Sequence, residues 1–314
     1  MKLRIIDKII FHFNHRFFVK QWIIGFAKDD IKGIIRKKRF DKEIKWLHLG
    51  QLNRQYADPF FLKQGDNTYD LFIEDVTTDD HYGKLALLTV DQEFNQVDHT
   101  IILDTHSHLS YPYIYRENGK IYVFPEASRS RKLSCYEYNP SNKSLSFLKE
   151  IIDLPLLDSN IFRYQGKYWI LGAVREKSNQ DNYEMVCFIS DNLLGPYAPH
   201  PANPIKKGLD GIRAAGNIIE VDGVLYRPTQ DCGDDYGKSI TINRINVLSE
   251  EVIDEQPYMS ISINRKEKSN AGMRNIHTIN VIDDLIVVDG KKWTFSPIRQ
   301  HRELMKEKKY LKKV

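Results

Sequence analysis

Several carboxylate side chains stand beside strand-like runs, where they could cooperate in chemistry at a glycosidic bond. Making or breaking such a bond needs a carboxylic acid to protonate the leaving oxygen and a carboxylate to act as base or nucleophile. Carboxylates that gather in one place push one another's pKa values apart, which is the usual route to one acid and one base. The candidates are Asp58, Glu74, Asp75, Glu126, Asp158 and Asp231.

Three of these carboxylates are predicted to be catalytic. Asp58 is the first choice for the base, and Asp158 would orient the sugar or tune a neighbouring group. Glu126 is the best remaining acid, because the apolar residues on either side of it favour a neutral carboxyl. Glu74, Asp75 and Asp231 are predicted to bind substrate.

Cationic and aromatic side chains indicate contacts with a phosphate, a carboxylate or a sugar ring of the substrate. Arg213 offers a planar fork that matches phosphate or carboxylate. Together with Arg227, His108 and His277, it could hold the diphosphate of a nucleotide-linked or lipid-linked sugar, or an acidic sugar. Arg227 also fits a structural ion pair with a neighbouring acid. Tyr111 and Tyr236 could stack on a sugar face or pack between structural elements.

Familiar cofactor and nucleophile motifs do not occur in the sequence. It contains no P-loop, no GxGxxG and no DxD, so no standard nucleotide or metal–diphosphate site is indicated. A GxSxG nucleophile motif is also missing. We therefore expect no cofactor and no bound metal.

The elements that must position these residues come from a repeat of β-hairpins. Five hairpins begin near Tyr56, Leu109, Leu157, Gly211 and His277, and their turns centre on Gly65, Gly119, Gly166, Gly223 and Asp283-Asp284. Asp58, Tyr111, Asp158, Arg213 and His277 are expected to start the first strands, and they recur every 47 to 64 residues. This spacing allows four strands per repeat and predicts an all-β, five-bladed β-propeller. If each first strand is innermost, these five residues ring one mouth of a central funnel.

The charge distribution divides the 314-residue chain into three parts. Residues 1–40 carry a net charge of +8 and residues 299–314 carry +5, which leaves −9 for the expected propeller at 41–298. The first part is predicted to be a basic amphipathic segment, partly packed on the propeller. It either lies on an anionic membrane or packs with its basic face in water. Nucleic acid is not an expected partner, since the acidic body would repel it.

The expected compartment follows from the cysteine pattern and from the lack of targeting segments in the sequence. Three widely spaced cysteines give neither a disulfide framework nor a zinc motif. No secretory signal and no apolar run of 18 residues is present. We expect a cytoplasmic protein that could sit at the inner face of the membrane.

A set of short motifs resembles a known family. The motifs include Ala57-Asp58-Pro59-Phe60, Glu74-Asp75, His108-Leu109-Ser110-Tyr111-Pro112, Pro125-Glu126, Arg213-Ala214-Ala215-Gly216 and Tyr226-Arg227-Pro228-Thr229-Gln230-Asp231, followed by Tyr236-Gly237. In this order, over residues 20 to 300, they resemble the propeller domain at the N-terminus of plant glucosamine inositolphosphorylceramide transferases. Related bacterial domains occur in surface-polysaccharide genes. The resemblance implies carbohydrate handling and adds Gln230 to the predicted substrate-binding residues.

A wider similarity is to five-bladed glycoside hydrolases of the arabinanase and invertase type. Asp58 and Asp158 match their first-blade and third-blade acids. The arabinanase type has a fourth-blade Glu as proton donor, and here that position reads Arg213-Ala214-Ala215-Gly216. This departure argues against simple hydrolysis.

Three functions remain open from the sequence. The first is a glycosyltransferase-type enzyme, or a close accessory of a partner glycosyltransferase, in the synthesis of surface polysaccharide or glycolipid. The second is a glycoside hydrolase that uses Asp58 with Asp158 and Glu126. The third is a non-catalytic glycan-binding module.

Overall fold

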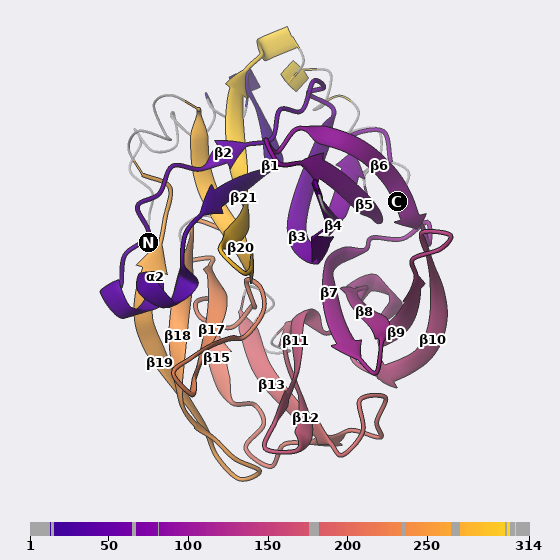
Figure 1. Cartoon of the computed structure of the whole chain (residues 1–314), viewed down its shortest axis with the longest axis vertical. Helices are drawn as coiled ribbons and strands as arrows, with labels where there is room; N and C mark the ends of the chain where they lie inside the picture. Colours follow the sequence, from indigo (N-terminus) through magenta and orange to yellow (C-terminus); the bar gives the residue numbers. More distant parts are fainter. Residues whose placement is uncertain are drawn as a thin grey trace.

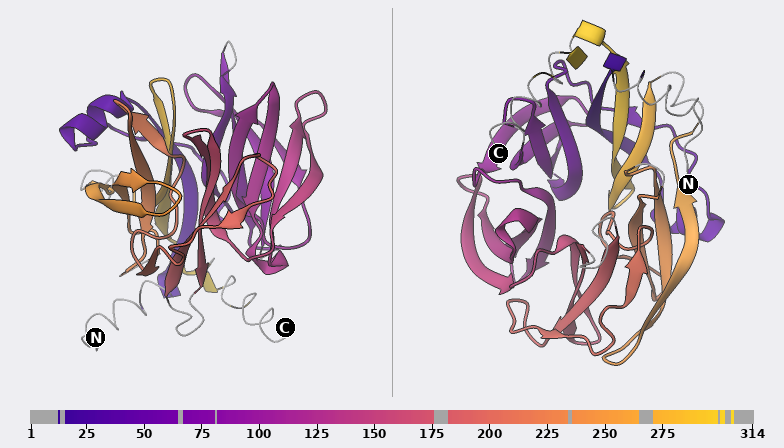
Figure 2. Two further views of the ribbon diagram at one scale, coloured as in Figure 1. Left: turned by 90° about the horizontal axis from the view of Figure 1, so that it is seen from below. Right: turned by 180° about the vertical axis from the view of Figure 1, so that it is seen from behind.

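The strand runs form antiparallel sheets of four or five strands that stand side by side around a common axis, as a computed structural model shows (Figure 1). The structure describes residues 13, 16–64, 67–80, 82–175, 182–233, 236–264, 271–298, 300, 301 and 305. Five such sheets make a five-bladed β-propeller, which confirms the predicted fold class. In the side view, the strands run from one face of the ring to the other (Figure 2).

The first three blades follow the chain in order from the innermost strand outward. Blade 1 holds β3 (Arg54–Gln64), β4 (Thr68–Thr77), β5 (Gly83–Asp91) and β6 (Gln96–Leu103). Blade 2 holds β7 (Ser110–Glu117), β8 (Lys120–Glu126), β9 (Leu133–Asn139) and β10 (Ser144–Ile152), with the short 3-10 helix η1 (Ser128–Ser130) after β8. Blade 3 holds β11 (Leu157–Tyr164), β12 (Lys167–Arg175), β13 (Tyr183–Ser190), β14 (Ala198–Pro199) and β15 (Lys206–Gly208), with β14 and β15 both paired to β13.

The last two blades differ from this pattern. Blade 4 holds β16 (Ile219–Val221), β17 (Val224–Asp231), β18 (Ser239–Leu248) and β19 (Ile253–Ile261). Blade 5 combines both ends of the described chain: β20 (Met273–Ile282), β21 (Leu285–Phe295), β1 (Phe18–Lys28) and β2 (Lys45–Trp46), with helix α2 (Ile31–Lys37) between β1 and β2. Pairing of β1 with β21 closes the ring, because it joins the start of the chain to its last hairpin.

Apolar side chains between neighbouring blades form the core. Ile24 and Val287 of blade 5 pack in one buried cluster with Tyr56 and Leu71 of blade 1. Every fully buried aliphatic or aromatic side chain of this kind stabilises the fold by about 1.5 to 3 kcal/mol. The blades are therefore held together mainly by apolar burial, and the polar residues are left for the axis of the ring.

The predicted hairpin turns are explained by the backbone. Asn118-Gly119, Gln165-Gly166 and Asp222-Gly223 all have positive φ angles at both positions, as a type I′ turn requires. Asp283 begins the fifth turn with a φ of 51°. Gly65, the predicted centre of the first turn, lies outside the described residues.

The range 1–40, expected as a basic segment, contains a full strand of the propeller. Trp22, Ile23 and Ile24 of β1 are buried, so this part of the basic segment belongs to blade 5. Helix α2 follows, with Asp30 capping its N-terminus and Arg36 paired to Asp222 of blade 4. Residues 1–12, on which most of the expected amphipathic helix falls, lie outside the described residues.

Three expectations about strand starts were wrong, because Asp58 and His277 are the fifth residues of β3 and β20 and Arg213 lies outside the strands. Arg213 does not start the innermost strand of blade 4, because β16 begins only at Ile219. The preceding segment instead makes a single bridge between Ala214 and Thr229 of β17. Arg213 therefore lies in an irregular segment, and the direction of its side chain is not set by the alternation of a β-strand.

The floor of the funnel is closed by a hydrogen-bonded group centred on Gly216. Its carbonyl accepts from the Tyr111 hydroxyl (3.1 Å) and the Asn160 amide (2.6 Å), and its N–H donates to the Tyr111 hydroxyl (2.8 Å). Tyr111 and Asn160 come from blades 2 and 3, so Gly216 joins three blades at the axis. A Cβ on Gly216 would lie 1.8 Å from the Ile279 carbonyl oxygen, and its φ is 133°.

Replacing Gly216 tests whether this floor holds the ring together. We expect Gly216→Ala to destabilise the protein by about 3 kcal/mol, because the new methyl group meets backbone that cannot move without shifting blade 5. Gly50→Ala is the matched control, since no atom lies within 4 Å of its added Cβ. Urea unfolding of both variants measures the difference, and equal midpoints would contradict this account of the floor.

Candidate active site

A β-bulge is repeated near the start of four innermost strands. Ala57 pairs with Glu74 and Phe60 with Phe72, so β3 has one residue more than β4 over this stretch. The same extra residue occurs in β7, β11 and β20, between Ser110/Tyr113, Leu157/Asn160 and Ile276/Ile279. A bulge bends its strand and re-aims a side chain. The four bulges contain Asp58, Tyr111, Asp158 and His277.

Three of the bulged residues have strained backbones. Asp58, Tyr111 and Asp158 have φ angles of 49°, 45° and 43°. Non-glycine residues rarely adopt such angles, and they persist where the surroundings over-determine them, commonly at functional sites. The three strained residues occupy equivalent positions in three blades, which indicates a common function at the axis.

A cavity of about 360 Å³ lies at this end of the axis. Seven of the residues predicted from the sequence line it: Asp58, Glu74, His108, Glu126, Arg213, Tyr236 and His277. They come from all five blades or from the loops that join them. The structure therefore brings together stretches of chain that are up to 219 residues apart.

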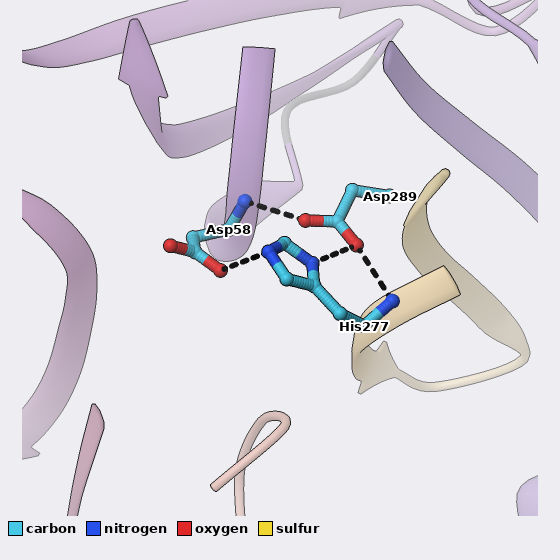
Figure 3. Close-up of side chains that lie close together, drawn as sticks. All are labelled: Asp58, His277 and Asp289. Atoms are coloured by element: carbon cyan, nitrogen blue, oxygen red, sulfur yellow. Dashed lines mark hydrogen bonds and ion pairs between the residues drawn. The ribbon is translucent and has the colours of Figure 1, made fainter. Parts of the chain in front are cut away.

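Asp58, His277 and Asp289 form a linked acid–imidazole–acid group (Figure 3). His277 Nδ1 lies 2.7 Å from Asp289 Oδ1, and His277 Nε2 lies 3.9 Å from Asp58 Oδ1. Asp289 also accepts hydrogen bonds from the backbone N–H groups of Asp58 (2.9 Å) and Thr278 (2.9 Å). Asp289 is fully buried, so its role is to hold the other two residues in place.

The pKa values in this group follow from burial and neighbouring charge. Burial raises the pKa of Asp58 to about 6, with His277 opposing the shift and Asp289 adding to it. Burial opposes the charged form of His277, but Asp289 and Asp58 outweigh it and raise the pKa of His277 above its usual value. The Trp22 ring stacks on the imidazole, with centroids 3.9 Å apart and planes 10° apart. Asp58 thus takes up and releases a proton near neutral pH, as a general base requires.

Glu74 is the second carboxyl that faces the cavity. Burial raises its pKa well above the usual value, and the charges of Asp58 and Glu126 raise it further. His108 stands beside it, with Nε2 at 3.6 Å from Glu74 Oε1. His108 Nδ1 accepts the Gly83 N–H (3.0 Å), and burial lowers the pKa of His108, so its ring is neutral with the proton on Nε2. Glu74 is therefore the carboxyl best suited to stay protonated and act as an acid.

Arg213 holds two of the three residues predicted to be catalytic. Its Nε donates to Asp158 Oδ2 at 2.6 Å, and its Nη2 lies 3.6 Å from Glu126 Oε2. Gln230 also donates to Asp158 Oδ2 (2.9 Å), which fixes that carboxylate. Asp158 is 2% exposed and does not line the cavity, so it orients Arg213 instead of facing a ligand.

Five predicted substrate-binding residues do not line the cavity, and one of them, Tyr111, is described below. Asp75 pairs with Arg54 and His99, because its side chain leaves β4 on the side opposite to Glu74. Arg227 is 1% exposed and paired with Glu255, which is the structural ion pair that the sequence left open. Asp231 accepts from the Ser239 hydroxyl (2.9 Å) and does not line the cavity. Gln230 acts through Asp158 and does not line it either.

Tyr111 and Tyr236, predicted to stack on a sugar, have different positions. Tyr111 is fully buried in the floor, and its N–H donates to Asp58 Oδ2 (3.1 Å). Tyr236 is 39% exposed at the wall of the cavity, with its ring 5.2 Å from the Arg213 guanidinium. Tyr236 can therefore meet a ligand, whereas Tyr111 positions the proposed base.

Sequence reasoning missed three residues that support this site. Asp289 is a buried acid within the apolar run Ile286-Val287-Val288, and such an interruption is the signal that could have found it. Thr278, next to His277, donates its hydroxyl to Asp58 Oδ1 (2.7 Å). Trp22 comes from β1, and nothing in the sequence pattern indicates that this strand pairs with the last hairpin, beside His277.

A metal ion is a possible occupant of the acid–imidazole–acid group on spacing alone. Asp58, His277 and Asp289 each offer an atom that lies within 4.8 Å of the other two. However, both Asp289 oxygens already accept backbone N–H groups, and Oδ1 also faces the imidazole Nδ1. This donor pattern fits a hydrogen-bonded relay better than a cation site.

Comparisons with known proteins agree with the resemblance seen in the sequence. A family described as glucosamine inositolphosphorylceramide transferase 1, N-terminal, matches residues 47–291. Glucosamine inositolphosphorylceramide transferase 1 of Arabidopsis thaliana is 35% identical over 227 residues, and that of Oryza sativa subsp. japonica is 33% identical over 229 residues. Each alignment covers 70% of this chain and 30% of the relative, so the chain spans about a third of these proteins.

Solved structures of similar fold are glycoside hydrolases. A family 117 enzyme from Zobellia galactanivorans has a TM-score of 0.54 at 12% identity, covering 90% of this chain and 92% of that one. A GH43 β-1,3-galactosidase, solved with galactodeoxynojirimycin, has a TM-score of 0.52 at 11% identity, covering 69% and 82%. At these identities the likeness concerns the fold alone.

The raised pKa of Glu74 makes a stability prediction with a definite sign. The protonated form is favoured in the folded protein, so this contribution to stability is present below the usual carboxyl pKa and is lost as the pH rises. Glu74→Gln stays neutral, and we expect it to melt about 2 °C or more above wild type at pH 8, with no difference near pH 4. The exposed Glu93→Gln is the control, and melting curves across this pH range measure both. An equal offset at every pH would contradict the assignment.

Proposed function

Because the chain belongs to the family of glucosamine inositolphosphorylceramide transferase N-terminal domains, we propose that its funnel cavity binds a sugar substrate for glycosyl transfer. The family relation supports a glycosyltransferase-related role, and the finer assignment rests on the cavity. One observation carries it: Asp58 and Glu74 face the same cavity, and burial raises the pKa of Asp58 to about 6 and that of Glu74 well above its usual value. Such a pair supplies one base and one acid at neutral pH.

The residues would divide the work as follows. Asp58 accepts the proton of the attacking hydroxyl while that oxygen bonds to the anomeric carbon. Glu74 donates its proton to the oxygen that leaves the anomeric carbon, so the overall charge is conserved. We place the acid at Glu74 instead of Glu126, because Glu126 Oε2 lies 3.6 Å from Arg213 Nη2, whereas Glu74 faces the ring of His108.

Arg213 and His277 would contribute positive charge to the same cavity. Arg213 lies against the Tyr236 ring, and His277 has a raised pKa. A phosphate of a nucleotide-linked or lipid-linked sugar would be attracted to these groups. The carboxylates of the same cavity would meet the sugar hydroxyls, or the amino group of an amino sugar such as the glucosamine in the relatives' name.

Hydrolysis is the second candidate, since Asp58 and Glu74 could also act on water. The acids expected for a hydrolase were Asp58, Asp158 and Glu126, and the last two are paired with Arg213. Because Asp158 and Glu126 are held by Arg213, we favour transfer over a hydrolysis that would use Asp58, Asp158 and Glu126. Release of free reducing sugar without an acceptor would identify a hydrolase.

The chain spans only part of its relatives, so it could work with a partner glycosyltransferase, as proposed from the sequence. A cytoplasmic location at the inner membrane face also remains a proposal. Among the described helices, none has the length and apolar character needed to cross a bilayer. Sugar binding by the isolated chain would not depend on either setting.

Asp58→Asn separates binding from catalysis. We expect nucleotide sugars, glucosamine among their sugar groups, to raise the melting temperature of both wild type and variant, because ligand binds the native state. Turnover, measured as nucleotide release, should fall about 10²- to 10⁴-fold in the variant. Asp98→Asn, on the outer strand β6, should keep full turnover.

Two results would overturn this assignment. Unchanged turnover in Asp58→Asn would remove Asp58 as the base. Binding of glycan by wild type with no turnover of any donor would leave a binding module, which was the third possibility from the sequence.

A further inference from the structure

Aromatic side chains from both ends of the described chain form a cluster at the edge of blade 5. Phe17 stacks on Phe295 with ring centroids 6.3 Å apart, and Phe18 meets Phe295 edge-on at 5.5 Å and lies 6.2 Å from Trp293. Phe13 joins the cluster 4.7 Å from Phe17. The Ser296 N–H donates to the Phe17 carbonyl (2.9 Å), which holds the two segments together. We call these residues, with Ile298, the terminal aromatic edge.

This edge leaves large apolar side chains in water. Phe13 is 51% exposed, Phe295 is 61% exposed and Ile298 is 74% exposed. Other exposed apolar residues of the described chain, such as Val97, Phe147 and Val252, belong to separate outer strands or loops of blades 1, 2 and 4. Exposed apolar side chains that gather in one place, beside polar neighbours, mark interaction surfaces.

The terminal aromatic edge lies on the side of the ring where the funnel opens. The innermost strands begin at the mouth, and Met273 at the start of β20 pairs with Lys292 near the end of β21. Lys20 at the start of β1 pairs with Trp293. Both views in Figure 2 place the short described pieces before β1 and after β21 close to each other, at the same face of the ring.

A second cavity lies next to this edge, at the start of β1. It has a volume of about 290 Å³ and is lined by Val19, Lys20, Arg54, Gln55 and Gln300, among others. Gln55 also lines the funnel cavity. Gln55 therefore stands between the surface near the terminal aromatic edge and the funnel cavity that holds Asp58.

The positive charge around the terminal aromatic edge indicates an anionic partner. Lys20 lies 4.5 Å above the Trp293 ring, and Arg16 sits between Phe13 and Phe17 in the sequence. The sequence segments that carry the edge have net charges of +8 (residues 1–40) and +5 (residues 299–314), whereas the rest has −9. Aromatic and aliphatic side chains flanked by Lys and Arg are typical of proteins that lie on anionic lipid.

We propose that the terminal aromatic edge docks on an anionic lipid bilayer and turns the mouth of the funnel toward it. A substrate whose sugar is linked to a membrane lipid would then reach the site without leaving the bilayer. This second statement rests on the proposed function, whereas the docking itself does not.

Vesicle binding tests the docking. The full chain should sediment with vesicles of phosphatidylcholine and phosphatidylglycerol, and binding should weaken in high salt or with phosphatidylcholine alone. The triple variant Phe13→Ser, Phe295→Ser, Ile298→Ser should lose about tenfold in partitioning. Val97→Ser, Phe147→Ser, Val252→Ser is the matched control, since its residues are similarly exposed but scattered, and it should bind like wild type.

The outcomes separate this proposal from the sugar site. Absence of wild-type binding to the anionic vesicles would overturn the docking, and so would an equal loss in the two triple variants. A surface that joins two copies of the chain would instead show a wild-type dimer that the first variant dissolves, with no lipid effect, and this too would overturn it. Melting shifts with nucleotide sugars should be unchanged in the first variant, so a failed sugar site would be recognised independently.

Discussion

The hydrogen bond from the Asp58 N–H to the Asp289 carboxylate joins the first blade to the last, at the place where the candidate site lies. Asp58 can make it because its bulge turns the backbone into the left-handed region. Asn280 adds a second link between these blades by donating to the Pro59 carbonyl (2.8 Å). Closure of the ring and orientation of the proposed base therefore depend on the same few contacts.

Burial at the axis gives the carboxylates their different characters. Asp289 is surrounded by N–H donors, Asp58 lies beside an imidazole, and Glu74 has only a neutral histidine close by among its described ion-pair partners. Asp289 is therefore structural, whereas burial raises the pKa of Asp58 to about 6 and the pKa of Glu74 well above its usual value. The fold produces these different environments because it brings strands from several blades to one axis. No single blade contains all the groups that surround these three carboxyls.

The fold and half of the site could be read from the sequence, for identifiable reasons. Asn118-Gly119 and similar turns mark each hairpin locally, so the number of blades followed from their repeat. Asp58 and His277 were singled out because they recur at equivalent places in the hairpin repeat, whereas Asp75 and Arg227 carry similar charges but point into ion pairs. The direction of a side chain at a bulge depends on tertiary contacts, and so does the arrival of Trp22 beside His277 through pairing of β1 with β21.

A crystal structure of the Asp58→Asn variant with a bound nucleotide sugar tests the central claim most directly, because the variant should bind without turning over. We expect the sugar in the funnel cavity, with a hydroxyl within hydrogen-bonding distance of residue 58 and the anomeric oxygen near Glu74. Arg213 or His277 should face the phosphate. A sugar bound on the outer strands, or in the funnel but out of reach of both Glu74 and residue 58, would contradict the account.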